Sequence, residues 1–159
     1  MAHQITIHNL GPISKCSLEL KNFTVLAGPQ SNGKSTIAKA VFFFRTVKQD
    51  ILQMMMQGGP KSVTGLSNAK WEITVKSRMR EKFLQLFGTS WVMPSDMEIV
   101  YHYRSDVYIR IFLVDNKIRT ERNFVDFEFS QQLRDFFLIW KNIHFWIFRL
   151  DKKSPRKDT

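Results

Sequence analysis

The feature that most constrains this chain is an eight-residue stretch, Gly28 to Ser35, with the sequence GPQSNGKS. It matches the pattern G-x-x-x-x-G-K-[ST], in which a short loop joins a buried strand to a helix. The flanking sequence fits this pattern, because the apolar run FTVLA (23–27) precedes the stretch and an amphipathic segment follows it. The motif in this setting predicts an α/β protein whose loop wraps an anion at a helix N-terminus.

Each position of the stretch has a physical role in binding the phosphates of a nucleotide. Gly28 allows the turn out of the strand, and Gly33 keeps a Cβ atom away from the place where backbone amides approach a phosphate. Lys34 is expected to reach the β- and γ-phosphates, and Ser35 to offer its hydroxyl to Mg²⁺. Thr36 supports them near the α-phosphate. The predicted nucleotide-binding residues are Gly28, Pro29, Gln30, Ser31, Asn32, Gly33, Lys34, Ser35 and Thr36.

Hydrophobic periodicity predicts the elements around this loop. Alternation over 4–8 and 15–20 predicts an antiparallel pair of strands, and the nearly continuous apolar run at 23–27 predicts a fully buried third strand. Apolar residues at steps of three and four predict a long helix over 34–56. A second helix is expected over 71–87 for the same reason.

The C-terminal half changes to a period of two. Strands are predicted over 97–103, 107–114 and 117–129, joined by short polar turns, which indicates an antiparallel meander. Ser130 can cap a last helix. Its expected apolar side consists of Leu133, Phe136, Phe137 and Trp140. We expect residues 1–140 to form one lobe, with a flexible connection over 58–70, and residues 141–159 to be an apolar segment with a basic tail.

Composition narrows the function classes. The 24 Lys and Arg against 14 Asp and Glu give a net charge of +10, which favours contact with phosphate, including DNA at a basic surface. The single cysteine excludes an intrachain disulfide framework. No run reaches the ~18 apolar residues of a membrane span, and no basic region with an apolar stretch opens the chain as a secretory signal would. We therefore expect a cytoplasmic protein with no membrane contact.

Residues for hydrolysis are less clearly marked than the loop. Asp115 follows the apolar run 111–114 and has two interpretations: the start of a hairpin turn with Asn116, or the carboxylate that helps to hold Mg²⁺. The four histidines show no metal-ligand spacing. Whether the chain is an enzyme stays open at this point.

The order of these elements resembles the N-terminal lobe of ABC-type P-loop ATPases of the RecF/SMC/OLD-like group, within the AAA family. The pair ITIHNLGPISKCSLELK precedes the loop strand FTVLAGPQSNGKST, and MEIVYHYRSDVYIRIFLVDNKI looks like the antiparallel sheet beside the nucleotide. The resemblance covers residues 3–140, and its specificity comes mainly from residues 3–45. It implies an ABC-type lobe with a phosphate-loop strand, a long helix and an antiparallel β-meander.

The resemblance also implies partners. In that family ATP lies between two heads, and the opposite head supplies a signature Ser-Gly segment. A second lobe supplies an apolar strand that ends in Asp-Glu and a switch histidine. This chain contains no matching Asp-Glu or signature segment, and Gln131 or Gln132 is the nearest counterpart of the family's inter-lobe glutamine. The resemblance therefore implies a truncated lobe that binds Mg-ATP and hydrolyses it only with C-terminal elements or in a head-to-head dimer.

Two other functions are compatible with the same residues. The chain can be a nucleic-acid or protein interaction module in which the phosphate loop is vestigial, a reading favoured by the positive charge and the apolar C-terminal segment. It can also be a small phosphotransferase that is complete at this length, and this reading requires Asp115 as its metal-side carboxylate.

Overall fold

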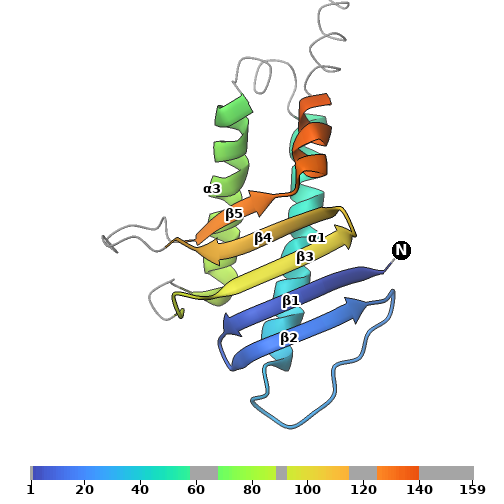
Figure 1. The fold of residues 1–159 in the computed structure, drawn as a ribbon, viewed down its shortest axis with the longest axis vertical. Helices are drawn as coiled ribbons and strands as arrows, with labels where there is room; N and C mark the ends of the chain where they lie inside the picture. Colours follow the sequence, from blue (N-terminus) through green and yellow to red (C-terminus); the bar gives the residue numbers. More distant parts are fainter. Residues whose placement is uncertain (1, 58–67, 89–92, 115–124, 140–159) are drawn as a thin grey trace, which may run out of the picture.

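The structure, a computed structural model, describes residues 2–57, 68–88, 93–114 and 125–139. Five strands form one antiparallel sheet in the order β2-β1-β3-β4-β5, and Figure 1 shows the long helix α1 running across it. Residues 131–139 form a further helical segment after the last strand. The elements in chain order are β1 (His3–Leu10), β2 (Ile13–Leu20), α1 (Lys34–Gln57), α3 (Asn68–Phe87), β3 (Glu98–Arg104), β4 (Val107–Leu113) and β5 (Val125–Phe129).

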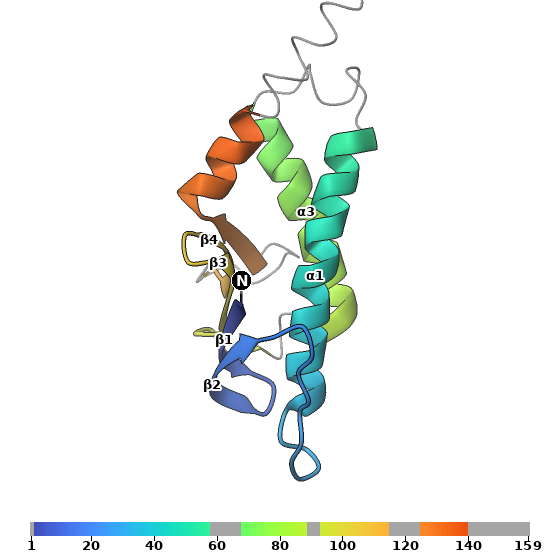
Figure 2. The same ribbon diagram turned by 90° about the vertical axis from the view of Figure 1, so that its right-hand side faces the viewer.

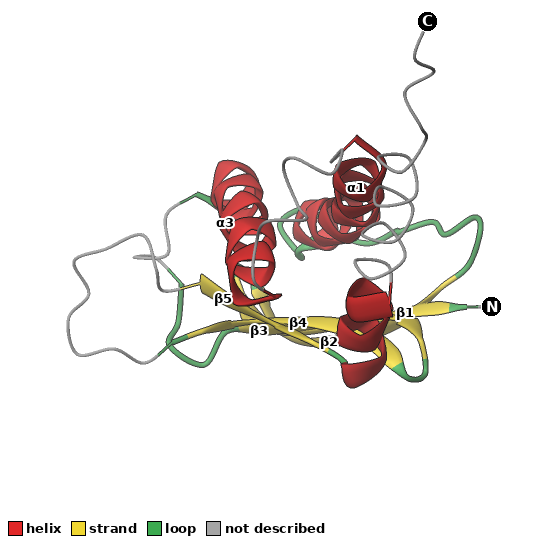
Figure 3. Cartoon of the chain, turned by 90° about the horizontal axis from the view of Figure 1, so that it is seen from above, coloured by secondary structure: helices red, strands yellow, loops and turns green. Residues whose placement is uncertain are grey.

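The two long helices pack against the same face of the sheet. Figure 2 and Figure 3 show α1 and α3 side by side over one face. Ile5 and Ile7 on β1 and Ile99 on β3 point to this face and are fully buried, whereas the residues between them on each strand are more exposed. Burial of one face and solvation of the other is typical of an antiparallel sheet.

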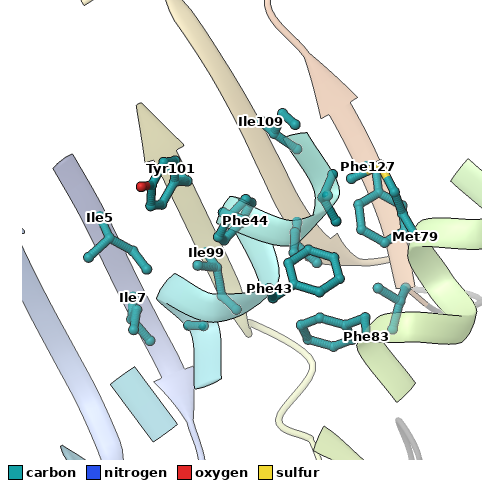
Figure 4. Packing of buried hydrophobic residues seen from close by; sticks show 14 of the residues in the cluster. Ile5, Ile7, Phe43, Phe44, Met79, Phe83, Ile99, Tyr101, Ile109 and Phe127 are labelled. Carbon is teal, nitrogen blue, oxygen red and sulfur yellow. The ribbon is translucent and has the colours of Figure 1, made fainter. Parts of the chain in front are cut away.

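Aromatic side chains of α1 fill the space between the layers. Phe44 stacks on Tyr101 of β3 with ring centroids 4.8 Å apart. Phe43 meets Phe83 of α3 edge to face at 5.6 Å and lies over Phe127 of β5. Figure 4 shows these rings between the strands and the two helices. Pairs with these geometries add to the stabilisation from apolar burial, so α1 is anchored both to the middle of the sheet at β3 and to its edge at β5.

The helices and hairpins confirm most of the predicted elements. α1 spans almost the predicted range, and α3 begins at Asn68, three residues before the predicted start. β1 and β2 are antiparallel, and β3, β4 and β5 form the predicted meander. The sequence did not indicate that β1 pairs with β3, which joins the N-terminal hairpin to the meander in one sheet. That pairing links segments about 95 residues apart, beyond the reach of local periodicity.

The predicted phosphate-loop strand at 23–27 is wrong in this structure. The segment forms no strand, and the side chains of Phe23 and Val25 are 84% and 70% exposed. The physical reason is that a strand forms only where a neighbour pairs with its backbone. The described sheet pairs β2 with β1 only, and the chain after Leu20 leaves the sheet. The segment therefore has strand-forming residues without a strand beside it.

The helical segment at 131–139 confirms the prediction after Ser130, with one error. The Ser130 hydroxyl accepts from the amide of Leu133 at 3.4 Å, as expected of a helix N-cap. Phe137 is buried against Phe129, but the predicted core residue Phe136 is 49% exposed, because its side chain leaves the helix on a different side. Trp140, residues 58–67, the first part of the predicted strand 117–129 and the segment 141–159 lie outside the described residues.

Candidate phosphate-binding site

The loop that contains the motif is curled back on itself. The ammonium group of Lys34 donates to the carbonyl of Gly28 at 2.8 Å and also to the carbonyl of Pro29. These acceptors precede Lys34 by six and five residues, so the chain between them must turn through a tight ring. Every residue from 28 to 32 is exposed. The backbone of the loop therefore curls around the Lys34 ammonium group, and its residues 28–32 are accessible to solvent.

Backbone torsions explain the curl. Gly28 and Gly33 have φ angles of 148° and 79°, and Ser31 has a φ of 67°. Asn32 lies between Ser31 and Gly33, which both have left-handed φ angles, and its own φ is negative. The φ angles from Ser31 to Gly33 match the alternating pattern of backbone turns in which successive N–H groups face one side and suit an anion. Glycine adopts these angles without steric cost, whereas Ser31 adopts one that side chains rarely occupy.

The loop leads into the N-terminus of α1. The first helical hydrogen bond runs from the amide of Ile37 to the carbonyl of Gly33 at 2.9 Å. The first turn contains no acidic residue, so no carboxylate of the helix offsets the partial positive charge of its free amides. Ser35 is exposed and Thr36 is half-buried at this end. The residues present therefore fit a phosphate group, with a hydroxyl beside it for a cation.

Gly33 is needed for a reason that the sequence did not reveal. A Cβ atom added at Gly33 would lie 2.5 Å from Cγ1 of Ile13, the first residue of β2. The motif indicates that this glycine allows close approach of a phosphate, and the structure adds a buried side chain directly behind it. The nearby turn also approaches the helix, because a Cβ on Gly11 would lie 3.7 Å from the Thr36 hydroxyl. The turn at Gly11 is visible in the sequence, whereas its contact with the loop is not.

The candidate catalytic residues do not gather at this loop. Gln131 and Gln132 are exposed in the helical segment, and Gln131 donates to Asp135 one turn along at 2.9 Å. Figures 1 and 2 place that segment level with the C-terminal half of α1, at the opposite end of the molecule from the loop. Asp115 lies outside the described residues. Within the described part of the chain, no predicted catalytic side chain is near the phosphate loop.

His3 and Cys16 have structural surroundings. His3 accepts from or donates to the phenol of Tyr101 at 2.7 Å, and burial together with Lys48 and Arg45 lowers the pKa of His3. Burial raises the pKa of the Cys16 thiol. The described residues contain no group of three or more His, Cys, Asp or Glu side chains that could hold a metal.

Four basic residues of α3 form a cluster: Lys76, Arg78, Arg80 and Lys82. Most of them bind other groups of the protein. Lys76 pairs with Glu72 and Asp126, and Lys82 pairs with Asp50. The guanidinium of Arg80 donates to a backbone carbonyl of β5 at 2.8 Å. Arg78 is exposed. The charge of this cluster therefore contributes mainly to the attachment of α3.

Comparison with known proteins identifies the family. A family model described as the AAA ATPase domain matches residues 1–147, which is nearly the whole chain. No curated protein and no solved structure matches significantly. None of the helices in the described ranges is long and apolar enough to cross a membrane. The curled loop at the start of α1 agrees with the family match, and the chain belongs to the AAA ATPase domain family of nucleotide-binding P-loop ATPases.

Proposed function

We propose that this chain binds Mg-ATP through residues 28–36, as one lobe of a RecF/SMC/OLD-like ATPase. The observation that carries the proposal is the closed loop at the N-terminus of α1, with the Lys34 ammonium against the carbonyls of Gly28 and Pro29. A loop of this curvature directs amides and a cation at one place, which suits a chain of phosphates.

The roles of the loop residues follow from their positions. The amides from Ser31 to Lys34 enclose a phosphate, and the Lys34 ammonium exchanges its two carbonyl acceptors for phosphate oxygens. The exposed hydroxyl of Ser35 contributes a ligand to Mg²⁺, and Thr36 lies at the side of the α-phosphate. Bound Mg²⁺ would neutralise part of the phosphate charge. The exposed residues Pro29, Gln30 and Asn32 form the outer rim of the loop.

Hydrolysis, in this proposal, requires a second lobe or a second head. The exposed apolar residues Phe23 and Val25 support this idea, because they lie immediately before the loop in a segment with the composition of a buried strand. A strand supplied by a second lobe would cover both side chains, and full burial of each is worth about 1.5–3 kcal/mol. The catalytic carboxylate and the residue that activates water would then come from the same added lobe.

The test compares Mg-ATP affinity, measured by isothermal titration calorimetry, in the wild type and Lys34→Ala. A hydrogen bond to a charged group contributes roughly 1.5–3 kcal/mol, so the loss of Lys34 should weaken binding about tenfold to a hundredfold. Lys48→Ala is the matched control, since it removes the same charge from the same helix about 21 Å further along. Equal affinities in the wild type and Lys34→Ala would reject the role of the loop.

A second candidate function is a nucleic-acid or protein interaction module with a vestigial loop. The net charge of +10 and the exposed apolar residues Phe136 and Ile139 favour it. Binding to DNA should then fall steeply with salt and persist in Lys34→Ala without nucleotide. The internal pairing of Lys76 and Lys82 lowers the charge available for such binding. We therefore place this function second.

A further inference from the structure

The phosphate loop rests on the hairpin between β1 and β2. Figure 2 shows this hairpin beside the N-terminal end of α1. Gly33 is buried, and its backbone lies so close to Ile13 that an added Cβ would be 2.5 Å from Cγ1 and 3.1 Å from Cδ1 of that side chain. Ile13 itself is 7% exposed. The side chain of Ile13 therefore fills the space directly behind the last turn of the loop.

The turn between β1 and β2 is held in place by core packing and by a side-chain hydrogen bond. Leu10 and Ile13 face each other across the turn, and both belong to the hydrophobic core. The side-chain amide of Asn9 donates to the carboxylate of Asp96 at 2.6 Å, which ties the turn to the segment before β3. The turn is thus held by the core and by a second segment. Because close-packed side chains transmit position, this turn can fix the phosphate loop that packs against Ile13.

The loop has little other support among the described residues. Residues 28–32 are exposed, and of the apolar residues before them Phe23 and Val25 lie in solvent, whereas Leu26 packs partly against the core. We propose that Ile13 is a positioning residue that holds the loop in its curled, phosphate-ready form. This inference rests on the proposed function for its effect on nucleotide affinity, but its effect on loop conformation stands without a ligand.

The size of the effect follows from preorganisation. Without the Ile13 side chain, Gly33 is free to leave its left-handed conformation, and the loop must be ordered again each time a phosphate binds. Ordering the backbone of about one residue corresponds to roughly a tenfold loss of affinity. The loss should grow with the volume removed from position 13.

The experiment uses three variants of the full chain. Ile13→Ala removes the support, Ile13→Val keeps most of it, and Ile109→Ala removes an equally buried side chain from β4. Mg-ATP affinity is measured by titration calorimetry, and amide hydrogen exchange of residues 28–36 is measured without nucleotide, at a temperature where circular dichroism shows every variant folded. We expect about tenfold weaker binding and faster exchange in Ile13→Ala. Ile13→Val should recover most of both, and Ile109→Ala should change neither.

The outcomes separate this inference from the proposed function. Wild-type affinity and exchange in Ile13→Ala would overturn the positioning role while leaving nucleotide binding intact. Equal weakening in Ile109→Ala would also overturn it, because the effect would then reflect general stability. If the wild type binds no Mg-ATP, the proposed function and the effect on affinity both fail, and exchange alone decides whether Ile13 supports the loop. Should Ile13→Ala not fold, a small rise in loop exchange in Ile13→Val that exceeds the rise in Ile109→Val supports the role, and a rise no larger than in Ile109→Val rejects it.

Discussion

Two pentapeptides of this chain are both predicted to form strands and differ completely in the structure. QITIH (4–8) lies in β1, where Ile5 and Ile7 are fully buried. FTVLA (23–27) is the more apolar of the two, yet Phe23 and Val25 are among its most exposed side chains. The difference is that β1 lies between β2 and β3, whereas no strand among the described residues lies beside the second segment. Apolar composition makes a strand possible, and a pairing partner makes it form.

The largest expected effect that tests this comparison is on β1. Ile7→Ala should lower the free energy of unfolding by about 2–5 kcal/mol, because it removes a fully buried side chain and leaves a cavity beneath α1. Urea denaturation followed by circular dichroism measures the change. Thr6→Ala, one residue earlier on the other face, should cost less than about 1 kcal/mol. Equal losses in the two variants would show that burial does not distinguish the faces of β1.

A smaller effect of opposite sign is expected in the loop. Ser31→Gly should raise the free energy of unfolding by roughly 0.5–1 kcal/mol, since the left-handed conformation costs a side-chain residue about 1–2 kcal/mol and glycine's greater freedom in the unfolded chain offsets part of the gain. Thermal denaturation detects the shift. Ser35→Gly is the control, because it places the same substitution at the start of α1, where glycine is destabilising. A loss of stability in Ser31→Gly would contradict the curled loop.

The helix, the hairpin and the loop show how much of the fold and of the candidate site the sequence could predict. The helix at α1 and the hairpin of β1 and β2 depend on periodicity and turn residues within a few positions, and both were predicted with nearly correct ends. The pairing of β1 with β3 and the contact of Ile13 with Gly33 join segments that no local pattern connects. The loop motif identified the candidate site, but its supporting residue came only from the structure.

Gln131 and Gln132, the catalytic candidates within the described residues, lie away from the loop for the same reason, and Asp115 lies outside the described residues. Gln131 and Gln132 were chosen by their order along the chain, and order does not say which end of a helix a residue will lie beside. The strand at 23–27 was predicted from its composition, which carries no information about neighbours. Local patterns therefore located the phosphate loop and its helix, whereas everything that depends on a distant partner required the coordinates.

A pH-dependent effect is expected at the start of β1. Burial and nearby cations lower the pKa of His3 below its usual 6.5, so the unfolded chain binds a proton more readily than the folded one. Above about pH 6.5 His3 is neutral in both states and does not reduce the free energy of unfolding. As the pH falls below 6.5, the unfolded chain takes up the proton first, and the free energy of unfolding decreases until the pH reaches the lower pKa of His3 in the folded chain. The effect should be modest, because His3 is partly solvated and water screens its charge.

The measurement compares urea midpoints at about pH 8 and about pH 5.5 in the wild type and His3→Gln. The wild type should lose more stability on acidification than His3→Gln does. His8→Gln controls for the loss of a histidine from the same strand. An identical pH response in the wild type and His3→Gln would mean that the end of β1 is as open to water as the segment at 23–27.

The smallest expected effect is on the exposed segment 23–27, the second of the two pentapeptides. Val25→Ala should change the free energy of unfolding of the chain by no more than about 0.5 kcal/mol, because a side chain that is 70% exposed loses little contact when shortened. Urea denaturation under the conditions used for Ile7→Ala makes the two values directly comparable. A loss above about 2 kcal/mol, the size expected of a buried aliphatic side chain, would mean that 23–27 is paired as a strand in solution. The contrast between the two pentapeptides would then vanish, and with it the argument that the residues before the phosphate loop await a strand from a second lobe.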